Sequence, residues 1–97
     1  MLVLPDTITL AQAKDVLRML EQARPRQAAG GDLLVVDASA VKRVDSSALA
    51  VLLEFARSAR AWGQRVVVRG PPPDLVGLAK LYGVDSLLLD APNASGR

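Results

Sequence analysis

The chain has 97 residues, a formal net charge of +2, 51% hydrophobic residues and 23% charged residues, which predicts one ordinary globular domain rather than a disordered or fibrous chain. It contains no histidine and no cysteine, which excludes a Ser-His-Asp mechanism, thiol chemistry and the commonest zinc ligands. Scattered basic residues and only three aromatic residues give little support to nucleic-acid binding.

No apolar run approaches the roughly 18 residues that a membrane-spanning helix needs. The first residues, MLVLPDTITL, also lack the basic region and the small-residue cleavage site of a secretory signal. We therefore expect a cytoplasmic protein.

The first elements are a short strand and a helix. Residues 2–4 form an apolar run that predicts an edge strand. A helix is expected over about 10–23, because Thr9 and Gln12 have the spacing of a capping box and Pro25 ends the pattern. The apolar positions of this helix recur at helical intervals: Leu10, Ala13, Leu17, Leu20 and Ala23.

A strand, a helix and a second strand follow. Residues 33–36 are continuously apolar, which is typical of a strand covered on both faces, and Asp37 ends it. A helix is expected over 48–62, closed by Gly63, before a second apolar strand at 66–68. This order predicts a right-handed crossover between parallel strands. The helix has a wide apolar arc: Ala48, Leu49, Val51, Leu52, Leu53, Phe55, Ala56, Ala59 and Trp62.

The last elements are a third helix and a strand. Residues 70–73 are a stiff turn in which Pro73 suits the first position of a helix over 74–82. Residues 87–89 are expected to add a strand, and residues 91–97 are expected to form a flexible tail. The pattern as a whole predicts a single α/β domain.

The loop after the first apolar strand is crowded with polar residues. Asp37, Ser39, Asp45, Ser46 and Ser47 all lie beyond the carboxyl end of that strand, where α/β folds meet ligands and partners. Asp45 or Ser46 is suited to cap the following helix. One cap needs only one of these side chains, so the others invite a functional explanation. A phosphate on Ser46 or Ser47 would suit a helix start.

Catalysis and metal binding are weaker interpretations of this loop. A serine nucleophile would have only carboxylates or Lys42 as its base, and the spacing of Asp37 and Asp45 matches no calcium or magnesium loop. Lys42 and Arg43 are suited to an acidic partner, or simply to solvent.

The outer face of the helix over 48–62 has unusually small side chains. The small residues along it are Ser47, Ala50, Ser58 and Ala61, and only Glu54 and the flanking Arg57 project. A flat face of this kind suits contact with another protein, although alanine also simply favours helix formation.

The stretch from Asp37 to Leu49, DASAVKRVDSSAL, resembles the signature of STAS domains. In that signature a strand ends in Asp, and Asp-Ser-Ser or Asp-Thr-Gly begins a helix. Residues 78–88, LAKLYGVDSLL, are similar to the third-helix segment of the MlaB-like branch. The resemblance covers about residues 2–90, and it implies one α/β domain in which helices pack on a mixed sheet. No cofactor, metal or catalytic activity is implied.

The two main branches of the family imply different partners. MlaB-like members are cytoplasmic subunits of a phospholipid ABC transporter, whose MlaF-like ATPase subunit meets the hydroxyl at the position of Ser46; they reach the membrane only through that complex. The alternative branch, the anti-sigma factor antagonists, is phosphorylated by an anti-sigma factor serine kinase at the position of Ser47. Those antagonists have Gly after Asp-Ser-Ser, where this chain has Ala48, so the transporter branch is favoured.

We therefore expect a non-enzymatic protein whose interaction surface surrounds the start of the second helix. The expected partner-binding residues are Ser39, Lys42, Arg43, Asp45, Ser46, Ser47, Ala50 and Glu54.

Overall fold

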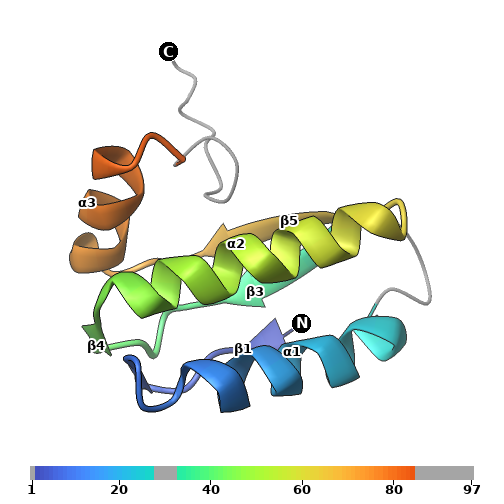
Figure 1. Ribbon diagram of the computed structural model, residues 1–97, viewed down its shortest axis with the longest axis horizontal. Helices are drawn as coiled ribbons and strands as arrows, with labels where there is room; N and C mark the ends of the chain where they lie inside the picture. The colour runs from blue at the N-terminus through green and yellow to red at the C-terminus, as the bar shows by residue number, and fades with distance from the viewer. Residues whose placement is uncertain (1, 28–32, 85–97) are drawn as a thin grey trace.

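A computed structural model describes residues 2–27 and 33–84 (Figure 1). The helices are α1 (Ala13–Gln27), α2 (Ser46–Ala61) and α3 (Pro73–Leu81). The strands are β1 (Leu2–Val3), β2 (Thr7–Ile8), β3 (Leu33–Asp37), β4 (Arg43–Val44) and β5 (Arg65–Arg69). The helices and the strands β1, β3 and β5 follow the order that the sequence predicts, and the described residues also contain two short strands that it does not predict, β2 and β4.

The main sheet has the order β1-β3-β5. Both of its strand pairs are parallel, with Leu2 opposite Val36 and Val35 opposite Val67. The crossover predicted between the two long apolar strands is therefore confirmed, and these strands are neighbours. A second, parallel pair joins β2 to β4. Within residues 2–27 and 33–84 every strand pair is parallel, so the antiparallel member of a mixed sheet is not found there.

Helices cover one face of the main sheet in the described residues. Leu34 and Val36 of β3 are buried, and so are Val66 and Val68 of β5, whereas Leu33 is 47% exposed. In agreement with this alternation, α1 and α2 lie side by side over the strands (Figure 1). The expectation that β3 is covered on both faces is therefore wrong for the described part of the chain. A continuous apolar run does not distinguish the two arrangements.

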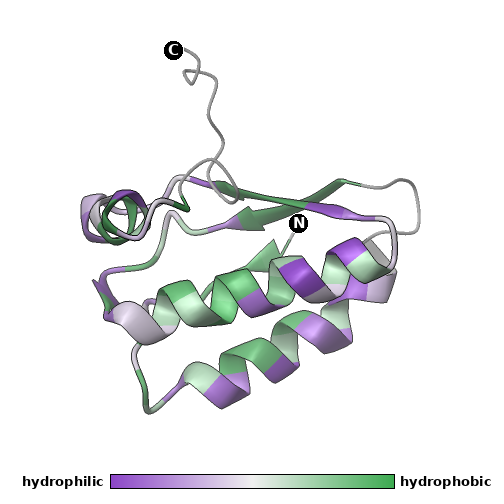
Figure 2. Cartoon of the chain, turned by 45° about the horizontal axis from the view of Figure 1, so that its top comes forward, coloured by the Kyte–Doolittle hydropathy of each residue, from purple (hydrophilic) through white to green (hydrophobic). Residues whose placement is uncertain are grey.

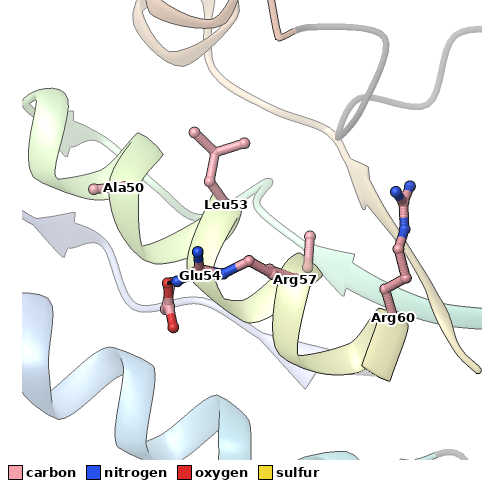
Figure 3. Close-up of a pocket in the computed structure, with 6 residues that line it drawn as sticks. Ala50, Leu53, Glu54, Arg57 and Arg60 are labelled. Carbon is pink, nitrogen blue, oxygen red and sulfur yellow. Dashed lines mark hydrogen bonds and ion pairs between the residues drawn. The ribbon is translucent and has the colours of Figure 1, made fainter. Parts of the chain in front are cut away.

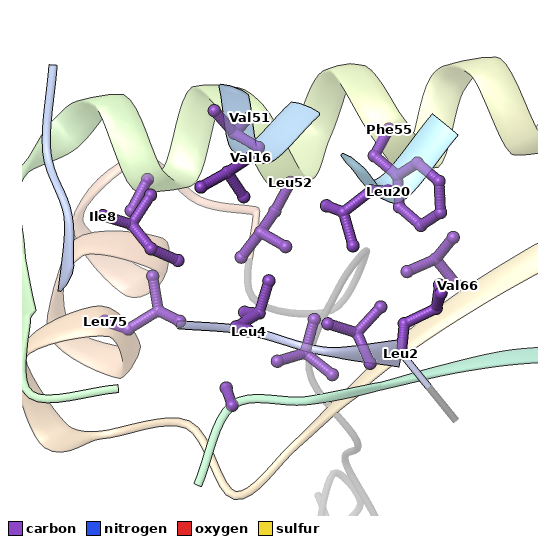
Figure 4. Packing of buried hydrophobic residues seen from close by; sticks show 14 of the residues in the cluster. Leu2, Leu4, Ile8, Val16, Leu20, Val51, Leu52, Phe55, Val66 and Leu75 are labelled. Carbon is purple, nitrogen blue, oxygen red and sulfur yellow. The ribbon is translucent and has the colours of Figure 1, made fainter. Parts of the chain in front are cut away.

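The core lies between this sheet face and the helices (Figure 4). Phe55 and Leu52 of α2 are fully buried, as are Leu20 of α1, Leu4 after β1 and Leu75 of α3. Because α2 supplies six buried residues and lies between α1 and α3 (Figure 1), it is the central helix of the domain. Its orientation is therefore fixed by packing along most of its length.

The first helix differs from its prediction at both ends. It begins at Ala13. Only half of the expected capping box forms in the preceding turn: the Gln12 side chain accepts hydrogen bonds from the backbone N–H and the hydroxyl of Thr9, whereas the Gln12 N–H donates to the Thr9 carbonyl oxygen. Leu10 lies on this turn and is 77% exposed, so its expected place on the buried face is wrong. The helix also continues past Pro25 to Gln27. A proline in the last turn disturbs few helical hydrogen bonds, since little helix follows it.

The later elements agree closely with the predictions. Gly63 follows α2 with a φ of 75°, the left-handed conformation expected of a helix-ending glycine. Trp62 is 69% exposed, contrary to the prediction, because the helical projection no longer applies where α2 ends. Pro73 begins α3. The strand predicted at 87–89 and the tail at 91–97 lie outside the described residues. None of the helices in the described ranges is both long enough and apolar enough to cross a membrane.

Candidate partner-binding site

Of the two residues expected to cap α2, Asp45 and Ser46, the N-cap is Asp45. Its Oδ1 accepts a hydrogen bond from the backbone N–H of Ser47 at 2.8 Å. Its Oδ2 accepts one from the backbone N–H of Leu10, 35 residues earlier in the chain, at 3.2 Å. One carboxylate therefore satisfies a free amide of α2 and fixes the turn before α1 beside it.

The segment before Asp45 is held by backbone contacts. The carbonyl oxygen of Asp6 accepts hydrogen bonds from the N–H groups of Lys42 at 2.8 Å and Arg43 at 3.0 Å, next to the short β2–β4 pair. Both cationic side chains are exposed. The backbone is thus fixed while the two side chains remain at the surface.

Ser39 lies at the carboxyl ends of β3 and β5. Its backbone N–H donates to Oδ1 of Asp37 at 2.9 Å. The pKa of Asp37 is lowered by the hydrogen bond from the Ser39 hydroxyl and then by that from the backbone N–H. Gly70, with a φ of 65°, packs so closely on Ser39 that an added Cβ would lie 3.0 Å from the Ser39 Cβ. Only glycine suits this contact.

The start of α2 presents hydroxyls and small side chains at the surface. Ser46 and Ala50 are exposed, and Ser47 is half-buried. Ser47, Ala50 and Glu54 share one side of the helix and, together with Val51, line a shallow groove. Its opposite wall is α1 and the turn before it, with Leu10, Ala13, Lys14 and Leu17. The sequence does not predict the α1 wall, because the packing of α1 against α2 and the Asp45–Leu10 hydrogen bond join segments that are far apart in the chain.

A second shallow groove runs along the outer side of α2 (Figure 3). The α2 residues that line it are Ala50, Leu53, Glu54, Ala56, Arg57 and Arg60. Glu54 and Arg57, which are three residues apart on the helix, form an ion pair there. The projecting pair expected on this face is therefore neutralised internally, and the face around it is largely apolar.

Most of the expected partner-binding residues lie together at the start of α2, and Ser39 does not. Asp45, Ser46, Ser47, Ala50 and Glu54 lie on α2 or its cap. Lys42 and Arg43 lead directly into the cap. Ser39 is different: its described contacts are with Asp37 and the turn at Gly70, and no hydrogen bond joins it to α2 in residues 2–27 and 33–84.

The surface at the start of α2 presents groups that are suited to contact with another protein. The chain has no histidine or cysteine, and in the part of the chain that the structure describes no three acidic residues gather as metal ligands. Exposed hydroxyls, small side chains and shallow apolar grooves are features that another protein surface can pack against.

The parallel α/β fold, with Asp-Ser-Ser beginning its central helix, defines a domain of the STAS class. The family described as "Mlab, STAS domain" matches residues 2–90, and the chain belongs to this family. It is 32% identical over 84 residues to the intermembrane phospholipid transport system binding protein MlaB of Escherichia coli K12, with 87% of each chain covered. The same identity and coverage hold for the MlaB protein of Shigella flexneri.

Proposed function

We propose that this chain is a non-enzymatic STAS subunit that binds and regulates the ATPase subunit of an Mla-type phospholipid ABC transporter. The names of the related proteins from Escherichia coli and Shigella flexneri support the transport system. Binding to an ATPase would place the chain at the cytoplasmic face of the membrane, with the nucleotide site and the lipid path in other subunits.

The observation that carries the proposal is that the Asp45 side chain, and not a serine hydroxyl, caps α2. Both oxygens of Asp45 are occupied, by Ser47 N–H and Leu10 N–H. The exposed Ser46 hydroxyl is therefore not needed to hold the helix, and it is available to a partner. Ala50, one turn further along the same helix, is exposed as well, so a partner can approach the helix closely at this point.

The surrounding charges would give this contact its specificity. Lys42 and Arg43 are exposed on the segment entering α2, and Glu54 is exposed two turns into the helix. Charged groups at the rim of an interface set orientation and association rate more than affinity. The small central side chains would then make the close contact, with Ser39 at the edge of the surface.

The anti-sigma factor antagonist alternative requires phosphorylation of Ser47, with Ser46 as a second candidate. Ser47 is half-buried, and its backbone N–H is already bound by the Asp45 carboxylate. A phosphate on Ser47 would lie close to that carboxylate, which is unfavourable through like-charge repulsion. Because the antagonists share Asp-Ser-Ser, this repulsion does not separate the two branches, and the transporter role is favoured by Ala48 at the position where the antagonists have Gly.

Reconstitution with the transporter ATPase encoded in the same genome tests the proposal. We expect the two chains to copurify as a stable complex and the ATP hydrolysis rate of the complex to differ from that of the ATPase alone. The chain by itself should hydrolyse no ATP. Absence of a complex, together with phosphate transfer to Ser47 by a serine kinase from the same organism, would replace this proposal with the antagonist alternative.

A further inference from the structure

A basic and apolar surface lies at the opposite end of α2 from Ser46. Here α2 ends and β3 and β5 begin (Figure 1). Trp62 is 69% exposed and Leu33 is 47% exposed, while Arg60 and Arg65 are exposed as well. We call these residues the basic end. Leu33 and Arg65 are direct neighbours, because they are paired across β3 and β5.

The positive charge of the basic end is not balanced within the described residues. Arg60 and Arg65 make no hydrogen bond or ion pair in residues 2–27 and 33–84. The nearby carboxylate of Glu21 accepts a hydrogen bond from Ser58 and lies beside Arg24. Figure 2 shows hydrophilic residues gathering toward this end of α2. The two free guanidinium groups therefore face solvent with their full charge.

Trp62 is held in place although it is exposed. The Arg24 guanidinium lies 5.0 Å from the centre of its ring, within the range of a cation–π contact. Arg24 is itself fixed by a 3.1 Å hydrogen bond to the side-chain oxygen of Gln64. The indole is thus positioned on one face by a cation that is mostly covered, while most of its surface remains accessible.

We propose that the basic end binds the anionic surface of a phospholipid bilayer. An indole has an apolar body and a polar N–H, so it favours the boundary between headgroups and acyl chains. Arginine side chains beside it bind phosphate groups and gain from the negative surface potential of the leaflet. Leu33 adds apolar area next to Arg65.

A bilayer fits this surface better than an acidic protein does. The charged groups are few and of one sign, and Trp62, Leu33 and Arg65 line neither of the two grooves described above. A protein partner needs a shaped and sizeable contact area. Binding to an anionic leaflet requires neither a shaped nor a large contact area, because the charge of the leaflet is diffuse and its headgroups can rearrange around a small inserted side chain.

This contact is compatible with partner binding at the start of α2 and does not depend on it. The helix has 16 residues, so its ends are separated by about 24 Å. The subunit can therefore touch a membrane at one end while Ser46 is covered at the other. Failure of one contact leaves the other unaffected, which makes the two proposals separable.

The intrinsic fluorescence of Trp62 is a direct probe, since it is the single tryptophan of the chain. Vesicles of phosphatidylglycerol and phosphatidylcholine would be titrated into the isolated protein, with pure phosphatidylcholine vesicles as the comparison. We expect the emission to shift to shorter wavelength with the anionic vesicles only. Raising the salt to about 1 M, where the Debye length falls to about 3 Å, should weaken binding strongly.

Charge reversal identifies the residues responsible. The double variant Arg60→Glu with Arg65→Glu should bind anionic vesicles about tenfold or more weakly. The matched control, Arg18→Glu with Lys80→Glu, reverses two exposed cations on α1 and α3 and changes the net charge equally, so it should bind nearly as the parent does. Circular dichroism would establish that both variants are folded.

Three results would overturn the proposal. One is an unchanged Trp62 emission with anionic vesicles in low salt. Another is an equal loss of binding in both double variants, which would indicate attraction through net charge alone. The third is binding to an acidic polypeptide such as polyglutamate but not to vesicles, which would make the basic end a protein-binding surface.

Discussion

Asp45 joins two parts of the chain that are 35 residues apart, because its Oδ2 accepts a hydrogen bond from the backbone N–H of Leu10 at 3.2 Å. Its other oxygen caps α2 through Ser47. The turn before α1 and the first turn of α2 are therefore placed by the same carboxylate. Any partner that contacts Ser46 also meets a surface that includes Leu10.

The double role of Asp45 predicts a graded response to substitution. Asp45→Ala removes both hydrogen bonds and should lower the free energy of unfolding by about 1–2 kcal/mol. Asp45→Asn keeps one acceptor oxygen for the cap and loses only the acceptor for Leu10, so its cost should be smaller, about 0.5–1.5 kcal/mol. Urea unfolding of both variants measures the difference. Equal stabilities of the two variants would mean that the retained cap bond to Ser47 contributes nothing, and parent-like stability of Asp45→Asn would mean the same of the Leu10 contact.

Leu52 and Leu53 should respond differently to truncation. Leu52 is 1% exposed in the core, whereas Leu53 is only partly buried at its edge. Leu52→Ala should therefore cost about 2–5 kcal/mol. Leu53→Ala removes less buried area and should cost about 1–2 kcal/mol. Thermal melts would show whether the order is right, and a larger loss at Leu53 would mean that the orientation of α2 is wrong.

Two glycines provide a matched pair. Gly70 has a φ of 65° and lies against Ser39, so Gly70→Ala should destabilise the fold by about 1–3 kcal/mol through backbone strain and crowding. Gly77 lies within α3 with open space around its Cα. Gly77→Ala should instead stabilise by about 0.5–1 kcal/mol. Urea midpoints that move in the same direction for both would contradict the described turn at Gly70.

The pKa of Asp37 should depend on Ser39. The hydroxyl and the backbone N–H of Ser39 hold this pKa below its ordinary value of 3.8. The resulting stability is fully present above pH 3.8 and is lost as the pH falls through the lowered folded-state pKa. Ser39→Ala should raise the pKa toward the ordinary value without fully restoring it, since the backbone N–H remains. An NMR titration of the Asp37 carboxyl carbon measures this, and an unchanged pKa would exclude the hydroxyl as its main cause.

The periodic elements of this fold are accessible from the sequence. The amphipathic pattern from Ala48 onward predicts α2 closely, because about four turns of regular apolar spacing leave little ambiguity. Strands β3 and β5 are equally clear from their apolar runs. The pattern wrongly predicts that Leu10 and Trp62 are buried. Each lies just outside a helix, and a projection at 100° per residue applies only within one.

The short elements are not accessible in this way. Strands β2 and β4 have two residues each, too few for any periodicity, and they depend on backbone hydrogen bonds to Asp6 from a segment far along the chain. The sequence does predict the serines of the site, because they stand at the start of a helix that is itself predicted. The sequence does not predict the α1 wall of the groove, because that wall requires the packing of α1 against α2 together with the long-range hydrogen bond between Asp45 and Leu10.

The central claim is that the surface at the start of α2 binds the transporter ATPase, and the affinity of the Ser46→Arg variant tests it most directly. Ser46 is exposed at the first position of α2, so the variant should fold. It should lose affinity for the ATPase at least about tenfold, because a bulky unpaired charge is buried at the contact. Ala61→Arg, at the far end of the same helix, is the matched control. The account predicts near-parent affinity for Ala61→Arg and a large loss for Ser46→Arg, both measured by calorimetry on folded protein; parent-like affinity for Ser46→Arg would contradict it.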